Sequence, residues 1–132
     1  MEIAITLPKH LWNKICSGEK KFECRKRIPR DFMCCCNKVW VVQKGTASVV
    51  GWFTVDEFLT FIDVEEIRDS YLDKICVDRE WFDAYAKNED TLCLWRIGHN
   101  VHKLSEPRDR DRFLDIHNNP QFFAYCRGRL VC

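Results

Sequence analysis

The chain has 132 residues, which is enough to bury one sizeable core and too few for two, so we expect one domain over residues 1–132. Hydrophobic residues make up 46% and charged residues 31% of the chain, a composition that excludes disordered and collagen-like proteins. No apolar run approaches the ~18 residues of a membrane span, and the amino terminus lacks a signal-peptide pattern. We therefore expect a cytoplasmic protein without a membrane partner.

The first two predicted elements are a strand and a helix. Residues 2–6 (EIAIT) alternate in polarity, as a short strand does. Pro8 suits the first turn of a helix, and Gly18 supplies its stop. Between them, one apolar stripe has the spacing of a helix face and consists of Leu11, Trp12, Ile15 and Cys16.

From residue 20 the sequence changes to the period of a strand. Phe22 and Cys24 alternate with Glu23 and Arg25, which predicts a half-buried strand with the charged pair on one face. The strand should end before Pro29.

A hairpin is expected next. Residues 38–43 (KVWVVQ) and 48–55 (SVVGWFTV) are β-branched and aromatic runs on either side of a turn at Gly45. Gly51 interrupts the second run and is a candidate β-bulge.

Two consecutive helices should follow the hairpin. Asp63 and Glu66 have the spacing of a capping box, which predicts a helix that begins there. Its apolar face consists of Val64, Ile67, Tyr71 and Ile75. A second helix is predicted from Asp78, and it should bury Trp81, Phe82 and Tyr85.

The last third of the chain returns to strand character. Residues 91–98 (TLCLWRIG) indicate a strand, residues 106–112 (EPRDRDR) a charged loop, and residues 120–126 (PQFFAYC) a closing strand. The strand pairs are joined by short turns and the two middle helices are consecutive, so a βαβ series does not fit. The pattern predicts an α+β protein, a small mixed and mostly antiparallel β-barrel with flanking helices.

The nine cysteines are not a disulfide framework, because their count is odd and their spacing irregular. Reduced thiols that pack as small hydrophobes are expected at Cys16, Cys24, Cys76 and Cys93. Residues 34–36 are three consecutive cysteines rather than the spaced pairs that wrap a zinc ion, so no metal and no cofactor is predicted.

The charges are strongly separated along the chain. Residues 9–30 contain eight Lys or Arg and two Glu, a net charge of +6, whereas residues 54–90 carry a net charge of −8. A basic patch beside aromatic side chains attracts phosphates and stacks bases. Two alternatives remain: the two regions neutralise each other within the fold, or the acidic helices bind a protein partner.

The basic segment resembles a known family. Gly18, Lys20, Glu23 and Arg25 match the G-x-K-x-x-E-x-R motif of ASCH domains, which belong to the PUA-like superfamily. The closing PQFFAY is similar to the P-Q-S-F-x-Y near the end of these domains, so the resemblance spans nearly the whole chain. It implies a PUA-like barrel whose cleft binds RNA or a nucleotide-like ligand.

The resemblance also implies that Lys20, Glu23 and Arg25 converge in that cleft, although strict alternation would send Lys20 to the opposite face. Arg25 can grip a phosphate, Lys20 adds a mobile charge, and Glu23 can accept hydrogen bonds from an exocyclic amine. Alternatively, Glu23 and Arg25 merely form an ion pair that orients the strand. The other predicted ligand-binding residues are Lys21, Lys26 and Arg27 at a positive rim and Trp52 as a stacking surface.

Two enzymatic alternatives also follow from the resemblance. Some small bacterial relatives are amidohydrolases that deacetylate N(4)-acetylcytidine with a lysine at the place of Lys20 and a threonine at that of Glu23. In this alternative Lys20 and Glu23 would be catalytic. A lysine beside a carboxylate, however, is a poorer general base than a lysine beside a neutral hydroxyl, because the carboxylate favours the charged form of the lysine. A ribonuclease role has also been attached to some relatives, and its natural acid or base here would be His99 or His102.

Overall fold

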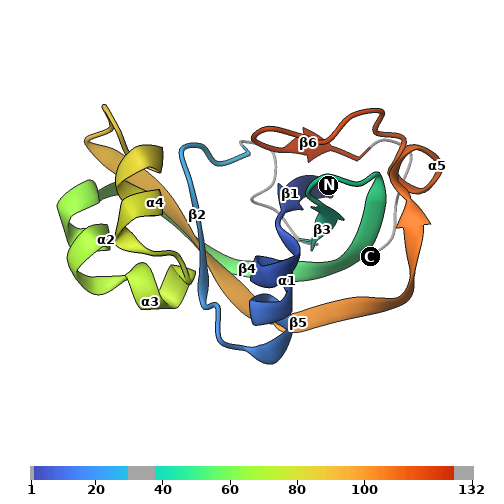
Figure 1. The fold of residues 1–132 in the computed structure, drawn as a ribbon, viewed down its shortest axis with the longest axis horizontal. Coiled ribbons are helices and arrows are strands. Elements are labelled where there is room, and N and C mark those ends of the chain that lie inside the picture. The colour runs from blue at the N-terminus through green and yellow to red at the C-terminus, as the bar shows by residue number, and fades with distance from the viewer. Residues whose placement is uncertain (1, 30–37, 127–132) are drawn as a thin grey trace.

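The computed structural model describes residues 2–29 and 38–126, which form one mixed sheet and several short helices (Figure 1). The strands are β1 (Ile3–Leu7), β2 (Phe22–Arg25), β3 (Lys38–Gln43), β4 (Ser48–Asp63), β5 (Thr91–Asp109) and β6 (Ala124–Tyr125). The helices are α1 (Lys9–Ser17), α2 (Val64–Ser70), α3 (Leu72–Ile75), α4 (Arg79–Tyr85) and α5 (Arg110–Leu114).

The described strands form a sheet in the order β2-β5-β4-β3-β1-β6. Only the β1–β3 pair is parallel within this sheet, so the predicted mixed, mostly antiparallel α+β class is confirmed. The predicted closure into a barrel is not confirmed, because β2 and β6 are the edges of the described sheet.

The long strands β4 and β5 connect two ends of the molecule. Figure 1 shows α2, α3 and α4 gathered at one end of this ribbon and α5 at the other, while α1 lies between them. Strand β2 pairs with the part of β5 nearest the helices, with Glu23 opposite Trp95. The basic strand therefore lies beside the acidic helices.

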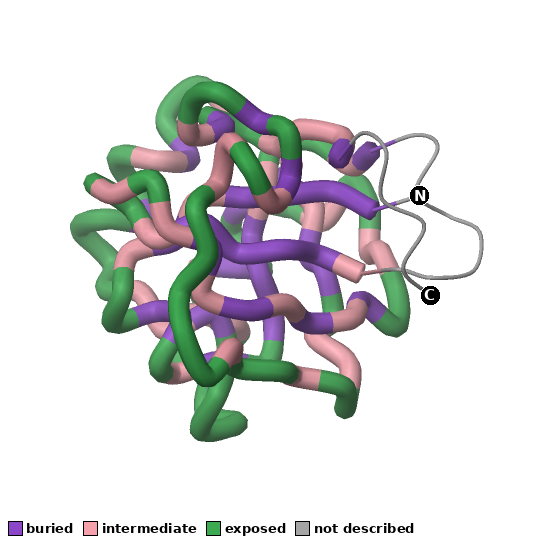
Figure 2. Tube along the Cα trace, turned by 90° about the vertical axis from the view of Figure 1, so that its right-hand side faces the viewer, coloured by how far each residue is buried: buried purple, intermediate pink, exposed green. Residues whose placement is uncertain are grey.

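The buried residues form three hydrophobic clusters along the sheet. One packs α1 against β1, β3 and β4; the second packs the middle helices against β2 and β5; and the third lies under α5. Figure 2 shows the buried stretches running through the centre, with exposed chain outside them. Phe22 and Cys24 belong to the second cluster, as their alternation predicted.

Helix α1 follows its predicted pattern. Leu11, Trp12 and Ile15 are buried, and Gly18 ends the helix at φ 82°, in the left-handed region that glycine adopts without strain. Cys16 is exposed, contrary to the prediction, because the buried face of the helix ends at Ile15.

The two central strands cross α1 at very close range. A Cβ at Gly51 would overlap the Trp12 ring and the backbone carbonyl of His102, so glycine is required for this contact. The β3–β4 register shifts between Val41 and Val42, opposite Gly51, and the β4–β5 register shifts beside Gly51, as the candidate bulge predicted.

A helix begins directly after Asp63, as predicted, but the Asp63 side chain makes no capping hydrogen bond. Two other local predictions are wrong. Trp81 is 47% exposed, since Phe82 takes the buried position of α4. Residues 106–112 continue β5 and begin α5 instead of forming a loop. Pro107 is tolerated there because β2 ends well before it and leaves one side of β5 unpaired.

The cysteine predictions are only partly right. Cys24 is buried, but Cys76 and Cys93 are half-buried. Cys93 alternates with the buried Leu92 and Leu94 and so faces the other side of the sheet. The consecutive cysteines at positions 34–36 lie outside the described residues.

Candidate functional site

Lys20 is turned inward by the bend that follows Gly18. Its backbone N–H donates to Lys14 O at 3.0 Å, which closes the turn after α1. The side chain is 1% exposed, and its ammonium donates to the Ile75 carbonyl at the end of α3 over 2.7 Å. A bend through positive φ thus overrides the alternation that would send Lys20 to the other face.

Glu23 joins the two cations of the motif. Its Oε1 lies 3.2 Å from Lys20 Nζ, and its Oε2 accepts two hydrogen bonds from Arg25, at 2.8 Å from Nη2 and 3.2 Å from Nε. The sequence-predicted trio is therefore brought together, and we call it the Lys20–Glu23–Arg25 network. The Glu23 side chain is 6% exposed, so this network is largely removed from water.

Arg25 extends this network to the opposite edge of the sheet. Its Nη1 donates to Phe122 O at 3.0 Å and its Nη2 donates to Thr6 O at 3.3 Å. Arg25 thus donates four hydrogen bonds to acceptors on three other residues, Glu23, Thr6 and Phe122. The guanidinium is committed to β1 and to the chain just before β6.

The two cations decide the charge state of Glu23. Burial raises the pKa of its carboxyl, but the charges of Lys20 and Arg25 and the hydrogen bonds they donate outweigh burial and leave the pKa below its ordinary value of 4.5. The carboxylate is therefore ionised at neutral pH. Removing it would leave two poorly solvated cations without their shared counter-ion.

A pocket of about 800 Å³ opens beside Lys20. Lys20 and Lys21 line it from the start of the basic strand, and Lys74 of α3 and Arg96 of β5 line it from the neighbouring elements. We call it the cationic pocket. Its size falls within the range of small-molecule sites, roughly 300–1,000 Å³.

Aromatic rings connect the cations of this pocket. Lys74 Nζ lies 5.2 Å from the centre of the Tyr71 ring, which packs edge-on against Phe22 at 5.5 Å. Arg96 lies 5.2 Å over the Phe22 ring and pairs with Glu57 at 3.1 Å. The wall between Lys74 and Arg96 is therefore made of π-faces that favour cations.

Backbone hydrogen bonds hold Lys21 between α3 and β5. Its N–H donates to Lys74 O at 2.7 Å, and its own carbonyl accepts from the Ile97 N–H at 3.0 Å. Lys21 and Lys74 are exposed, and within residues 2–29 and 38–126 no carboxylate pairs with either. Both ammonium groups are available to an anion.

One carboxylate and one imidazole also line the pocket, those of Asp56 and His99. A Cβ at Gly98 would overlap the Asp56 carboxylate and would lie 2.6 Å from Thr54 Oγ1. The missing side chain of Gly98 therefore lets Asp56 lie against β5. Asp56 can accept hydrogen bonds that the lysines cannot.

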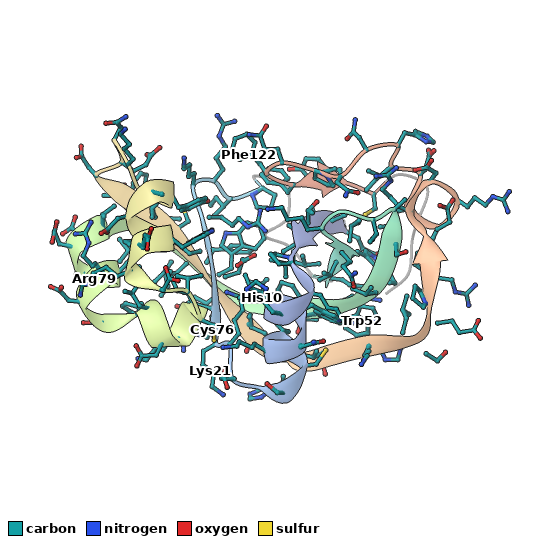
Figure 3. All side chains as sticks on the ribbon, viewed as in Figure 1. His10, Lys21, Trp52, Cys76, Arg79 and Phe122 are labelled. Carbon is teal, nitrogen blue, oxygen red and sulfur yellow. The ribbon has the colours of Figure 1, made fainter. Side chains whose placement is uncertain are left out.

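The other predicted residues lie elsewhere. Of the seven predicted ligand-binding residues, only Lys20 and Lys21 are among those that line the pocket. Lys26 and Arg27 follow β2 at its other end and contact the rings of Tyr85 and Phe122. Figure 3 shows Trp52 well away from Lys21.

Trp52 stacks on His102 at 5.6 Å, and Lys38 Nζ lies 4.3 Å from its ring centre. Neither Trp52 nor His102 is among the residues that line the cationic pocket, whereas His99 is. Of the two histidines considered as an acid or base, only His99 is therefore placed beside Lys20.

Sequence reasoning missed the half of the pocket that comes from distant segments. Those residues are Asp56, Tyr71, Lys74 and Arg96, whereas His99 had been considered as the acid or base of the ribonuclease alternative. Lys74 is surrounded in sequence by acidic residues, so its charge gave no signal. Arg96 offered a weak one, because it follows the core strand residues Leu94 and Trp95 and must face the other side from its neighbour.

Two searches found nothing in the described part of the chain. No group of three or more His, Cys, Asp or Glu side chains there is arranged to hold a metal ion. No helix in residues 2–29 and 38–126 combines the length and the apolar character needed to cross a membrane.

The structure is similar to crystal structures of ASCH from Zymomonas mobilis. The unsubstituted protein gives a TM-score of 0.79 at 18% identity and covers 96% of this chain and 88% of that one. A serine-to-alanine variant gives 0.81 at 18% identity, over 96% and 89%. A tyrosine-to-phenylalanine variant gives 0.77 at 19% identity, over 96% and 91%. The sequence matches no protein-family model and no curated protein, so the likeness is one of fold.

Proposed function

Because the chain has the ASCH-domain fold, we propose that it binds RNA or a nucleotide-like ligand, and that the phosphate enters the cationic pocket. The observation that carries the proposal is the pocket itself. Lys21 and Lys74 present two ammonium groups, neither with a carboxylate partner among the described residues, at a cavity large enough for a nucleotide. Cations without internal partners are the groups that an anionic ligand can neutralise.

The remaining pocket residues suit the other parts of a nucleotide. Tyr71 offers an aromatic face to a base, and Arg96 can exchange its exposed pairing with Glu57 for a phosphate. Asp56 can accept hydrogen bonds from an exocyclic amine or a ribose hydroxyl. In this proposal Glu23 and Arg25 act through Lys20, which they hold at the pocket wall.

The test is binding of a nucleoside monophosphate and a short single-stranded RNA, each measured at several salt concentrations. Lys74→Ala should weaken both and should reduce the slope of log affinity against log salt by about 0.7 for the RNA, the loss of one phosphate contact. The matched control is Lys87→Ala, which removes an exposed lysine just beyond α4 that does not line the pocket. Equal effects of the two substitutions, or no binding at low salt, would contradict the proposal.

One observation favours a second candidate function, cleavage of RNA. His99 lines the same pocket as three lysines, so an imidazole would lie beside a bound phosphodiester. Lys20, by contrast, is buried, donates to Ile75 O and pairs with Glu23, an arrangement that gives the amidohydrolase alternative no support. The test is whether RNA is shortened during incubation and whether His99→Ala abolishes the shortening while leaving RNA affinity unchanged. If the RNA stays uncut, cleavage is contradicted and binding remains the only proposed function.

A further inference from the structure

A second aromatic surface lies at the opposite end of β2 from the cationic pocket. Lys21 precedes this strand, whereas Lys26 and Arg27 follow it and lie against the half-buried Tyr85 ring and the exposed Phe122 ring. Figure 3 shows Phe122 and Lys21 on opposite sides of the view. We call this surface the aromatic strip, and it consists of Trp81, Tyr85, Lys26, Arg27 and Phe122.

Trp81 and Tyr85 form the first half of the strip. They lie one turn apart on α4, and their rings stack at 5.0 Å with an angle of 11° between the planes. Tyr85 is held in place from β2, because its hydroxyl accepts the Lys26 N–H at 3.1 Å and Lys26 Nζ lies 5.0 Å from its ring centre. Trp81 is 47% exposed, so the indole is open to a further ring.

Arg27 and Phe122 form the second half. The guanidinium lies 4.9 Å from the centre of the Phe122 ring, which is 39% exposed. Phe122 is fixed through its carbonyl, which accepts from Arg25 Nη1 at 3.0 Å. The strip therefore places two adjacent cations, Lys26 and Arg27, between the stacked rings of α4 and the Phe122 ring, and its three segments are far apart in the sequence.

The residues of the strip themselves carry two positive charges and no carboxylate. Burial raises the pKa of Tyr85 to about 12, so its phenol adds no negative charge. The nearest carboxylate to Lys26 is that of Glu89, at 4.0 Å, the outer limit of an ion pair. Arg27 has no carboxylate partner among the described residues.

We propose that the aromatic strip is a second binding site, which stacks unpaired nucleobases on Trp81 and Phe122 and holds the intervening phosphates with Lys26 and Arg27. Exposed rings interleaved with cations are the arrangement that binds single strands without reading their sequence. A protein partner would need an apolar face, whereas here cations lie against the Tyr85 and Phe122 rings, and Trp81 stacks on Tyr85. The inference rests on the proposed function only in taking a nucleic acid as the ligand.

The test uses an oligoadenylate of about ten nucleotides, within the range of single-strand sites, and an abasic oligomer of the same length that keeps the phosphates. Trp81→Ala should weaken binding of the oligoadenylate by at least about fivefold, the loss of one base stack, and leave the abasic oligomer unchanged. Trp81→Phe should retain most of the affinity because it keeps a ring. Arg27→Gln should weaken both oligomers and lower the salt slope by about 0.7.

The matched control is Phe61→Ala, which removes another exposed ring, 81% exposed, from the acidic part of β4. It should change neither oligomer's affinity. Circular dichroism and a thermal melt check folding, which Trp81→Ala should preserve because the backbone N–H that Asp78 accepts is retained. An oligodeoxyadenylate is measured in parallel. If Trp81→Ala weakens its binding as much as that of the oligoadenylate, only the base contributes to the contact. If the two losses of affinity differ, the ribose contributes as well.

The outcomes separate the strip from the pocket. Trp81-dependent binding of the oligoadenylate without any effect of Lys74→Ala would support the strip and contradict the pocket. If mononucleotide binding depends on Lys74 but Trp81→Ala leaves the affinity for the oligoadenylate unchanged, the proposal for the aromatic strip is wrong and the proposal for the pocket stands. An equal loss on the abasic oligomer would also overturn it, as would Trp81-dependent self-association without nucleic-acid binding.

Discussion

Glu23 connects two cations that water scarcely reaches, Lys20 and Arg25. Such a carboxylate adds little net stability relative to an apolar group, because its own desolvation offsets most of the attraction. Removing the Glu23 carboxylate should nevertheless be destabilising, because both cations would remain poorly solvated without their counter-ion. Lys20 is held at the pocket wall by Glu23 and by the Ile75 carbonyl together.

Glu23→Gln should therefore lower the free energy of unfolding by about 3–5 kcal/mol, the usual cost of breaking a buried ion pair. Urea denaturation of the purified protein measures it. The matched control is Glu65→Gln, which breaks the 2.7 Å pair with Arg68 at a side chain that is 80% exposed and should cost less than about 1 kcal/mol. Similar costs for the two substitutions would mean that the Lys20–Glu23–Arg25 network is solvated in solution.

The same carboxylate sets a pH dependence. The folded pKa of Glu23 lies below 4.5, so the stabilisation it brings is present above that value and is lost as the pH falls through the folded pKa. Denaturant midpoints from about pH 7 down to about pH 3 should fall more steeply for the wild type than for Glu23→Gln. Parallel curves for the two proteins would show that Glu23 titrates normally.

At the scale of elements, the turn after α1 places the motif. Gly18 and Gly45 both have φ 82°, and a Cβ at either would meet nothing within 4 Å. An L-residue at either position would therefore meet the same backbone strain, but only Gly18 leads into Lys20 and Lys21.

Gly18→Ala and Gly45→Ala should each lower the free energy of unfolding by about 1 kcal/mol, the cost of a left-handed conformation for an L-residue. Only Gly18→Ala should also weaken nucleotide binding, since relief of the strain would move the two lysines. Thermal melts and nucleotide titrations of both variants make the comparison. Loss of binding in Gly45→Ala as well would indicate a general effect of stability.

Secondary-structure elements were predicted correctly where the local sequence determines them. The predictions failed where pairing with distant segments determines them. The strand at Phe22–Arg25 and the left-handed stop at Gly18 follow from residue spacing and glycine geometry alone. Residues 106–112 look like a loop because of their charge, yet Arg108 and Asp109 pair with β4 at Val49 and Ser48, and residue 110 begins α5. Charge costs little in this end of β5, because its side chains stay exposed to water.

At the scale of the whole molecule, the two edges of the sheet meet through a side chain. Arg25 of β2 donates to Thr6 of β1 and to Phe122, two residues before β6. Strand β6 itself pairs with β1 through only two residues. The Arg25 guanidinium therefore contributes to an edge that has little backbone pairing of its own.

Arg25→Lys should loosen that edge, because one ammonium cannot reproduce the fork that reaches Glu23, Thr6 and Phe122 together. Amide hydrogen exchange at Ala124 and Tyr125 should accelerate at least about tenfold, a loss of about 1.4 kcal/mol of local protection. Exchange in β4 and β5 should stay slow and serves as the internal control. Uniform acceleration across the sheet would mean that Arg25 supports global stability instead.

The sequence by itself determined the motif strand, its buried and charged faces, the α+β class and the likeness to ASCH domains, because each depends on local spacing or on chemistry within a few residues. Tertiary structure alone decided that Lys20 is buried against Ile75, that Lys74 and Arg96 complete a pocket with Lys21, and that Trp81 stays exposed. These features join segments dozens of residues apart. Which side chains meet there depends on how α3, β2 and β5 pack, and no local pattern records that packing.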